Sequence, residues 1–256
     1  MARLTDTLTG SLTATIHSRG AKIEAYAPLE LRGPFPGASY YLRNTTAGVF
    51  GGDAYAVDVT ASADSTVRVS GSSATKVYVG TDGESCLSVR LNVEPGATLI
   101  WGPHATIVQG GARYRQSTHV DVAAGGRTIL GEILALGRLA RGEQFDFDRL
   151  ESSLNVRLCE TRVYSEAYIL QPGPNLVASM AGRGVLASVY AIGFDATVGE
   201  RLNCLLTERN ELAGWSALPN DAGVVVRGLF DSLSQGQAFV TQITRTFTDA
   251  WQPPAA

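Results

Sequence analysis

Residues 93–102 read VEPGATLIWG and residues 122–131 read VAAGGRTILG, so a strand, a glycine-bearing turn and a second strand recur after 29 residues. Residues 59–69 are a looser, earlier copy of this unit. Repetition of one strand–turn–strand unit is typical of stacked or coiled sheets rather than of a closed α/β fold. The alternative is that any two β-hairpins look alike, and the repeat by itself leaves this alternative open.

Alternating apolar and polar residues predict further strands around the repeat, because side chains in a strand point to opposite faces in turn. Leu87, Val89 and Leu91 fall on one face of residues 87–93. The same period of two marks residues 54–60, 66–70, 75–79 and 113–122, and residues 223–229 form a candidate buried strand.

The last third of the chain shows helical spacing instead. Apolar residues in 196–212 predict one helix, and Phe239, Ile243, Phe247 and Trp251 recur every four residues and predict a second over 234–251. We therefore expect a mainly β fold of coiled or stacked antiparallel sheets, solenoid-like, with about two α-helices in the C-terminal third. We expect one domain over residues 1–256, β-rich to 195 and helix-containing over 196–252.

Composition excludes several classes of protein. The net charge of −3, from 21 basic and 24 acidic residues, argues against a nucleic-acid binder. No apolar stretch reaches the roughly 20 residues of a membrane helix, and no signal peptide is visible. Three cysteines without a CxxC spacing argue against a disulfide framework and indicate a cytoplasmic protein. Charged residues make up only 18%, which predicts that a partner covers part of the surface.

Three acidic residues stand out as candidate functional groups. Glu132 and Glu166 are single carboxylates in apolar runs, so each must face water, pair with an arginine or line a polar cavity. Arg138 or Arg141 could supply a structural partner for Glu132. Asp53 follows two glycines and is either a turn cap or an inward carboxylate. Two of the three could act as glycosidase acid and nucleophile, so a carbohydrate-active β-solenoid enzyme is one alternative. A purely structural β-domain with salt-bridged carboxylates is the other.

Four blocks of sequence, in order and in register, resemble the urease accessory protein UreD family, called UreH in some species. The blocks are Gly51-Gly52-Asp53, residues 74–78 (ATKVY), residues 110–116 (GGARYRQ) and residues 132–143 (EILALGRLARGE). The resemblance runs from about residue 10 to the C-terminal helix.

The resemblance implies a mainly β scaffold that is not an enzyme. Such a scaffold joins the urease apoprotein to UreF and, through UreF, to the GTPase UreG, with no nucleic acid or membrane as a partner. It implies no tightly bound cofactor but a transient passage of nickel, a metal role that falls by position on Asp53 and Glu166 first and on Glu132 third. Lys76 and Arg113 lie in the matched blocks and are expected to hold the fold or face a partner.

Two segments depart from the family pattern. Residues 44–48 read NTTAG where many relatives have His-Pro-Pro-Gly-Gly, so a histidine that could contact metal is absent. Residues 103–105 read PHA where many relatives have Pro-Gln-Glu, which makes His104 either a ligand particular to this chain or a residue without a role.

Overall fold

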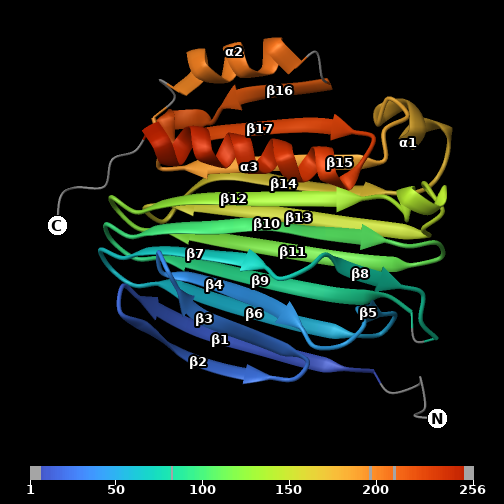
Figure 1. The fold of residues 1–256 in the computed structure, drawn as a ribbon, viewed down its shortest axis with the longest axis horizontal. Coiled ribbons are helices and arrows are strands. Elements are labelled where there is room, and N and C mark those ends of the chain that lie inside the picture. Colours follow the sequence, from blue (N-terminus) through green and yellow to red (C-terminus); the bar gives the residue numbers. More distant parts are fainter. Residues whose placement is uncertain (1–6, 82, 196–197, 210–211, 251–256) are drawn as a thin grey trace.

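Two β-sheets packed face to face make up most of the molecule, with helices on the outer face of the larger sheet (Figure 1). The computed structural model describes residues 7–81, 83–195, 198–209 and 212–250. Within these residues, one sheet has seven strands in the order β14-β13-β11-β9-β6-β1-β2. The other has ten, in the order β16-β17-β15-β12-β10-β7-β4-β3, with β8 beside β10 and β5 beside β8.

The chain passes back and forth between the two sheets over residues 54–158. The strands of the seven-stranded sheet are β1 (Thr9–His17), β2 (Gly20–Tyr26), β6 (Ala54–Ala61), β9 (Ser85–Val93), β11 (Arg113–Val122), β13 (Arg149–Leu158) and β14 (Thr161–Leu170). Those of the ten-stranded sheet are β3 (Leu29–Phe35), β4 (Ser39–Asn44), β5 (Val49–Phe50), β7 (Thr66–Gly71), β8 (Thr75–Tyr78), β10 (Thr98–Val108), β12 (Arg127–Ala135), β15 (Val185–Ile192), β16 (Leu212–Ala217) and β17 (Gly223–Phe230).

The 29-residue repeat is one turn of a β-solenoid of about four turns. Strand β10 pairs in parallel with β12, with Thr98 opposite Arg127, and β9 pairs in parallel with β11, with Ser85 opposite Tyr114. The mainly β, solenoid-like fold is therefore confirmed. The expectation of antiparallel sheets is wrong for the coil itself, because the turn in each unit is a corner that carries the chain into the other sheet, whereas a hairpin would return it beside itself. Antiparallel pairing is found at the ends of the coil, as in β1–β2 and β13–β14.

The corners of successive turns share one backbone conformation. Asp64, Gly96 and Gly125 occupy the same place in three stacked corners, and all have positive φ, at 54°, 70° and 70°. Each corner is closed by a backbone hydrogen bond between residues three positions apart, in which the later residue's N–H donates to the earlier carbonyl oxygen: Ser65 N–Ser62 O, Ala97 N–Glu94 O or Gly126 N–Ala123 O. Glycine adopts positive φ without steric cost, and aspartate tolerates it better than most residues, which is why this position of the repeat carries them.

Replacing Gly96 with alanine should lower the free energy of unfolding by about 1–2 kcal/mol. The backbone of Gly96 has positive φ, and a Cβ added there would meet the Asp64 carboxylate. Urea denaturation followed by circular dichroism measures the change. Gly20→Ala is the matched control: no atom lies within 4 Å of its Cβ position, and φ is not positive. Equal effects of the two substitutions would contradict the corner's role.

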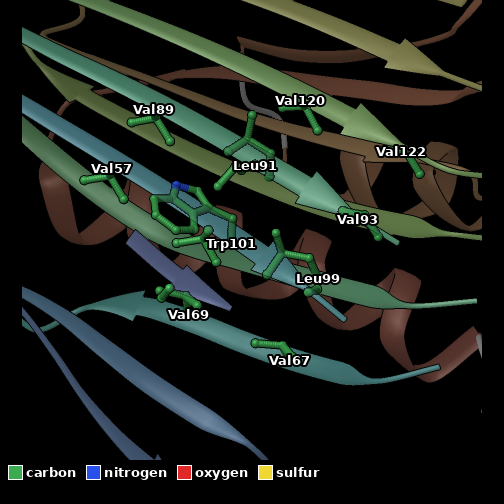
Figure 2. Packing of buried hydrophobic residues seen from close by; sticks show 14 of the residues in the cluster. Val57, Val67, Val69, Val89, Leu91, Val93, Leu99, Trp101, Val120 and Val122 are labelled. Atoms are coloured by element: carbon green, nitrogen blue, oxygen red, sulfur yellow. The ribbon is translucent and has the colours of Figure 1, made fainter. Parts of the chain in front are cut away.

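The main core fills the space between the sheets. Valines and leucines of β9 and β11 meet Leu99 and Trp101 of β10 across that space (Figure 2). The inward side chains of the central strands are nearly inaccessible to solvent, as with Leu91 and Leu99, both 0% exposed. This burial is the main source of the fold's stability, since buried apolar area is the dominant favourable contribution to folding.

A second core lies on the other face of the ten-stranded sheet, under helix α3 (Leu233–Ala250) (Figure 1). Phe239, Ile243 and Phe247 of α3 are fully buried against β12, β15 and β17. Strand β12 is thus covered on both faces, which explains why it reads as an almost continuous apolar run. Among these apolar neighbours the strand carries Glu132 on the face toward the other sheet.

The two predicted helices are confirmed as α2 (Gly199–Arg209) and α3, while Trp251 lies outside the described residues. A short helix α1 (Pro174–Ser179) was not expected, and 3-10 turns lie at Leu139–Arg141 and Pro219–Asp221. Ser232 and Gln235 cap the start of α3. The backbone N–H of Gln235 donates to Ser232 Oγ at 3.3 Å, and the backbone N–H of Ser232 donates to Gln235 Oε1 at 3.0 Å. In the described part of the chain, no helix combines the length and apolar character needed to cross a membrane.

Candidate functional site

A cavity of about 380 Å³ lies between the two sheets. At one end it is bounded by residues 44–48 and by 73–76, where Thr46, Ala47 and Lys76 are exposed to solvent. At the other end its wall includes Glu132 and Tyr190. The cavity therefore leads from the surface, at the segment that departs from the family pattern, to a carboxylate in the interior.

Two polar rows face each other across the inner end of the cavity. On the seven-stranded sheet, strand register places Gln116, Ser152 and Tyr168 side by side on β11, β13 and β14. On the ten-stranded sheet it places Glu132, Ser188 and Arg227 side by side on β12, β15 and β17. All six side chains occur at inward positions of strands whose inward side chains are mostly apolar. The sandwich thus contains a polar layer at one level, between two apolar cores.

Glu132 is held from across the gap by Gln116. The Gln116 side-chain amide donates to Glu132 Oε1 and also to Ser152 Oγ at 3.0 Å, so one side chain ties three strands together. Burial raises the pKa of Glu132 to about 7, and the negative charge of Glu166 adds to the increase. The positive charge of Arg227 and the hydrogen bond from Gln116 oppose it. Near neutral pH this carboxyl group therefore exchanges readily between its protonated and ionised forms.

The raised pKa predicts that Glu132→Gln is more stable than the native chain at alkaline pH. Between the ordinary pKa of 4.5 and about 7, the folded state retains a proton that the unfolded state releases, so Glu132 makes folding less favourable as pH rises. The amide is neutral throughout. We expect similar stabilities at pH 5 and a gain on the order of 2 kcal/mol for the variant at pH 8, measured by urea denaturation.

Glu151→Gln provides the control of opposite sign. A hydrogen bond from Arg149, together with the charges of Arg115 and Arg149, lowers the pKa of Glu151, so that variant should be less stable than the native chain at pH 8. A stability difference between Glu132→Gln and the native chain that stays constant from pH 5 to pH 8 would contradict the assignment.

Glu166 lies at the same end of the sandwich, on edge strand β14, and both of its carboxylate oxygens accept hydrogen bonds. Arg227 Nη1 donates to Oε1 at 2.8 Å and Nη2 donates to Oε2 at 2.7 Å. The hydroxyls of Tyr190 and Tyr164 donate to Oε2 at 2.9 and 3.1 Å. Burial alone would raise the pKa of Glu166, but the hydrogen bonds and charge of Arg227, helped by both tyrosines, lower it below the usual value. Glu166 is therefore ionised at neutral pH.

Asp53 has a different environment, in the turn before β6. Its Oδ1 accepts from the Leu8 amide at 2.9 Å, and its Oδ2 accepts from the Phe50 amide at 2.9 Å and from the Tyr55 hydroxyl at 3.0 Å. The side chain is 2% exposed, and Tyr55 rather than Asp53 contributes to the cavity wall. Burial and the Asp53 charge raise the pKa of Tyr55 to about 12. Asp53 therefore caps a turn and anchors a wall residue.

The structure thus brings Glu132 and Glu166 to one polar layer and leaves Asp53 apart from it. Of the two nearby arginines considered as structural partners of Glu132, Arg138 and Arg141, the first pairs with Glu143 instead. Lys76 borders the open end of the cavity, and Arg113 is exposed on the outer face of β11. His104 stands opposite Glu132 in the β10–β12 register, but its side chain lies outside what the structure describes.

Of the six residues in the two polar rows, sequence reasoning identified only Glu132, and it also missed Tyr190, which contacts Arg227 and Glu166. A signal existed for Arg227, because it is the only charged residue in residues 223–229, just as Glu132 is in its own run. No pattern marked Tyr190 or Gln116, since a tyrosine or glutamine in a strand is common on either face.

The cavity wall offers oxygen donors but no strong metal site. Among the described residues, no group of three or more histidine, cysteine, aspartate or glutamate side chains could hold a metal ion together. The Tyr114 hydroxyl is buried in the wall and has no hydrogen-bond partner among the described residues. The Tyr168 hydroxyl, which is buried but not part of the wall, likewise has none in that part of the chain. The single carboxylate in the described wall, Glu132, and the Tyr114 hydroxyl suit weak, transient contact with a hydrated divalent cation, because oxygen donors bind such ions more weakly than imidazole or thiolate sets.

Comparisons with known proteins agree on one family. Residues 10–256 match the model of the family described as UreD urease accessory protein. The urease accessory protein UreD of Haloarcula marismortui is 33% identical, covering 80% of this chain and 71% of the relative. The urease accessory protein UreD 2 of Streptomyces griseus subsp. griseus is 32% identical, covering 92% of this chain and 89% of the relative.

Proposed function

Because the chain belongs to the UreD urease accessory protein family, whose members are urease maturation factors and not enzymes, we propose that it passes nickel to urease through the cavity between its sheets. Nickel is the cargo in this proposal. It enters or leaves at the end bordered by residues 44–48 and 73–76, and Glu132 and Glu166 contact it transiently at the inner end.

The observation that carries the proposal is a cavity that joins the surface to a carboxylate in the polar layer between the two sheets. A half-buried glutamate is costly to keep in a core unless it is needed there. Glu132 makes no ion pair among the described residues and has a pKa near neutrality, so it can lose its proton to water and contact a cation without breaking a salt bridge. Conduction of an ion requires sites that bind weakly enough to release it, and this wall has that character.

We also propose that the chain is the scaffold between urease and the proteins that supply the metal. UreF, UreG acting through UreF, and the urease apoprotein are the proposed partners. The low share of charged residues supports a surface that partners cover, and Phe35 and Tyr41 form an exposed edge-to-face aromatic pair near the first turns of the coil.

The alternatives are weaker. Family membership identifies an accessory protein, which sets aside the carbohydrate-active enzyme. A purely structural domain accounts for the Glu166–Arg227 pair, but it gives no reason for a cavity that ends at Glu132.

The test uses a host that carries the urease genes, with this gene intact or deleted. Urease is purified from both strains, and its activity and bound nickel are measured. We expect deletion to leave urease assembled but without nickel, and a plasmid copy of the gene to restore it. Normal nickel content in the deletion strain would overturn the proposed function.

A further inference from the structure

Arg227 occupies the position in which a cation would bind Glu166. Its two terminal nitrogens contact both carboxylate oxygens, its Nε donates to Ser188 Oγ at 3.0 Å, and Nη2 also donates to the Tyr190 hydroxyl at 2.8 Å. The guanidinium carbon lies 6.0 Å from the centre of the Tyr190 ring. Oε2 of Glu166 accepts three hydrogen bonds in all, so this carboxylate has no oxygen left uncommitted for a metal ion.

The pair also stands at a boundary. Tyr190 contributes to the cavity wall and contacts the pair through its hydroxyl, whereas Glu166 belongs to the edge strand β14. The side chains of Arg227 and Glu166 keep 35% and 18% of their surface exposed. The pair therefore closes the inner end of the polar layer, one tyrosine beyond the cavity.

We infer that Arg227 is a resident counter-cation: it competes with the cargo for Glu166 and must swing away before a divalent ion can bind there. This inference rests on the proposed function, and it describes how the passage is regulated. With Arg227 in place, Glu166 is neutralised and a dication meets a positive charge, so affinity is low. Once Arg227 is displaced, the same carboxylate and two tyrosine oxygens become available to the ion.

The contact geometry explains why an arginine suits this role. Its planar fork matches both oxygens of a carboxylate at once, and it remains charged at any physiological pH. Its hold on the site therefore depends on geometry and not on protonation. Its Nε also donates to Ser188, and this contact can persist when the terminal nitrogens leave Glu166, so the side chain does not have to enter water entirely.

The experiment is calorimetric titration of the full chain with Ni²⁺. If Arg227 competes with the metal, Arg227→Met should bind Ni²⁺ at least tenfold more tightly than the native chain, and Glu166→Gln in the same background should abolish the gain. Arg157→Met, which removes an exposed arginine that is 3.7 Å from Asp121, controls for net charge and should change affinity less than twofold. Unchanged or weaker binding by a folded Arg227→Met chain overturns the inference.

A second variant keeps the test valid if Arg227→Met does not fold. Arg227→Lys retains the charge but replaces the two-pronged contact with a point charge, so we expect Ni²⁺ affinity to rise two- to fivefold. No gain with lysine overturns the inference in that case. The two proposals fail on different measurements. If Arg227→Met binds Ni²⁺ more tightly but urease from the deletion strain is fully loaded with nickel, the nickel passage is rejected, while Arg227 still competes with the metal for Glu166.

Discussion

Asp53→Ala should lower the free energy of unfolding by about 3 kcal/mol. The substitution leaves the Leu8 and Phe50 amides and the buried Tyr55 hydroxyl without their acceptor, and each unsatisfied buried donor costs roughly 1–3 kcal/mol. Because Leu8 is partly exposed, water replaces some of what its amide loses. Urea denaturation of the full chain measures the difference.

Two comparisons make this result specific to a structural role for Asp53. Asp53→Asn keeps one acceptor oxygen and should lose about half as much stability. Asp58→Ala, on the outer face of β6, removes a single contact with Asn92 and should cost under 1 kcal/mol. An Asp53→Ala chain as stable as the native one, but unable to support urease activation, would instead make Asp53 a contact for the metal.

Phe239→Ala is expected to have the largest effect of any single substitution considered, a loss of about 3–5 kcal/mol. Phe239 is 0% exposed, and its ring lies 4.9 Å from that of Phe230 beneath helix α3. Its removal leaves a cavity under the helix that covers β12, the strand that carries Glu132. Thermal and urea unfolding both measure the loss.

The matched control lies two residues away on the same helix. Gln237 is exposed, and alanine is the better helix former, so Gln237→Ala should change stability by less than about 0.5 kcal/mol. If Phe239→Ala were equally mild, α3 would not contribute to the second core as described.

The sequence identified strands well because alternation is a local property. Strands cover the predicted ranges 54–60, 66–70, 113–122 and 223–229 in full, and β8 covers the predicted 75–79 except for its last residue. Sheet membership was harder to predict. Residues 93–98 read equally well as a hairpin or as a corner, and the choice depends on the positive φ at Gly96 and on which earlier turn the strand meets. That choice depends on contacts between strands of successive turns, which are far apart in the chain, and the same contacts determine that the strands pair in parallel.

The candidate site was predictable in kind but not in its partners. A lone charge in an apolar strand has to face water, pair with an arginine or line a polar cavity, and the structure shows two of these outcomes: Glu166 pairs with Arg227, and Glu132 lines the cavity. The candidate arginines were near Glu132 in the chain, at Arg138 or Arg141, whereas the arginine in this layer is Arg227, 61 residues beyond Glu166. Contacts between sheets bring together residues distant in sequence, so spacing along the chain could not reveal them.

The central claim is that nickel moves past the carboxylates of the polar layer. The most direct test measures nickel per urease active site in hosts that express the native chain, the Glu132→Gln/Glu166→Gln double variant, or Glu151→Gln, which alters an ion-paired carboxylate on the outer face. Co-purification with urease and UreF first confirms that each variant assembles. We predict less than a tenth of the native nickel content with the double variant and native content with Glu151→Gln. Full nickel loading with the double variant would contradict the passage.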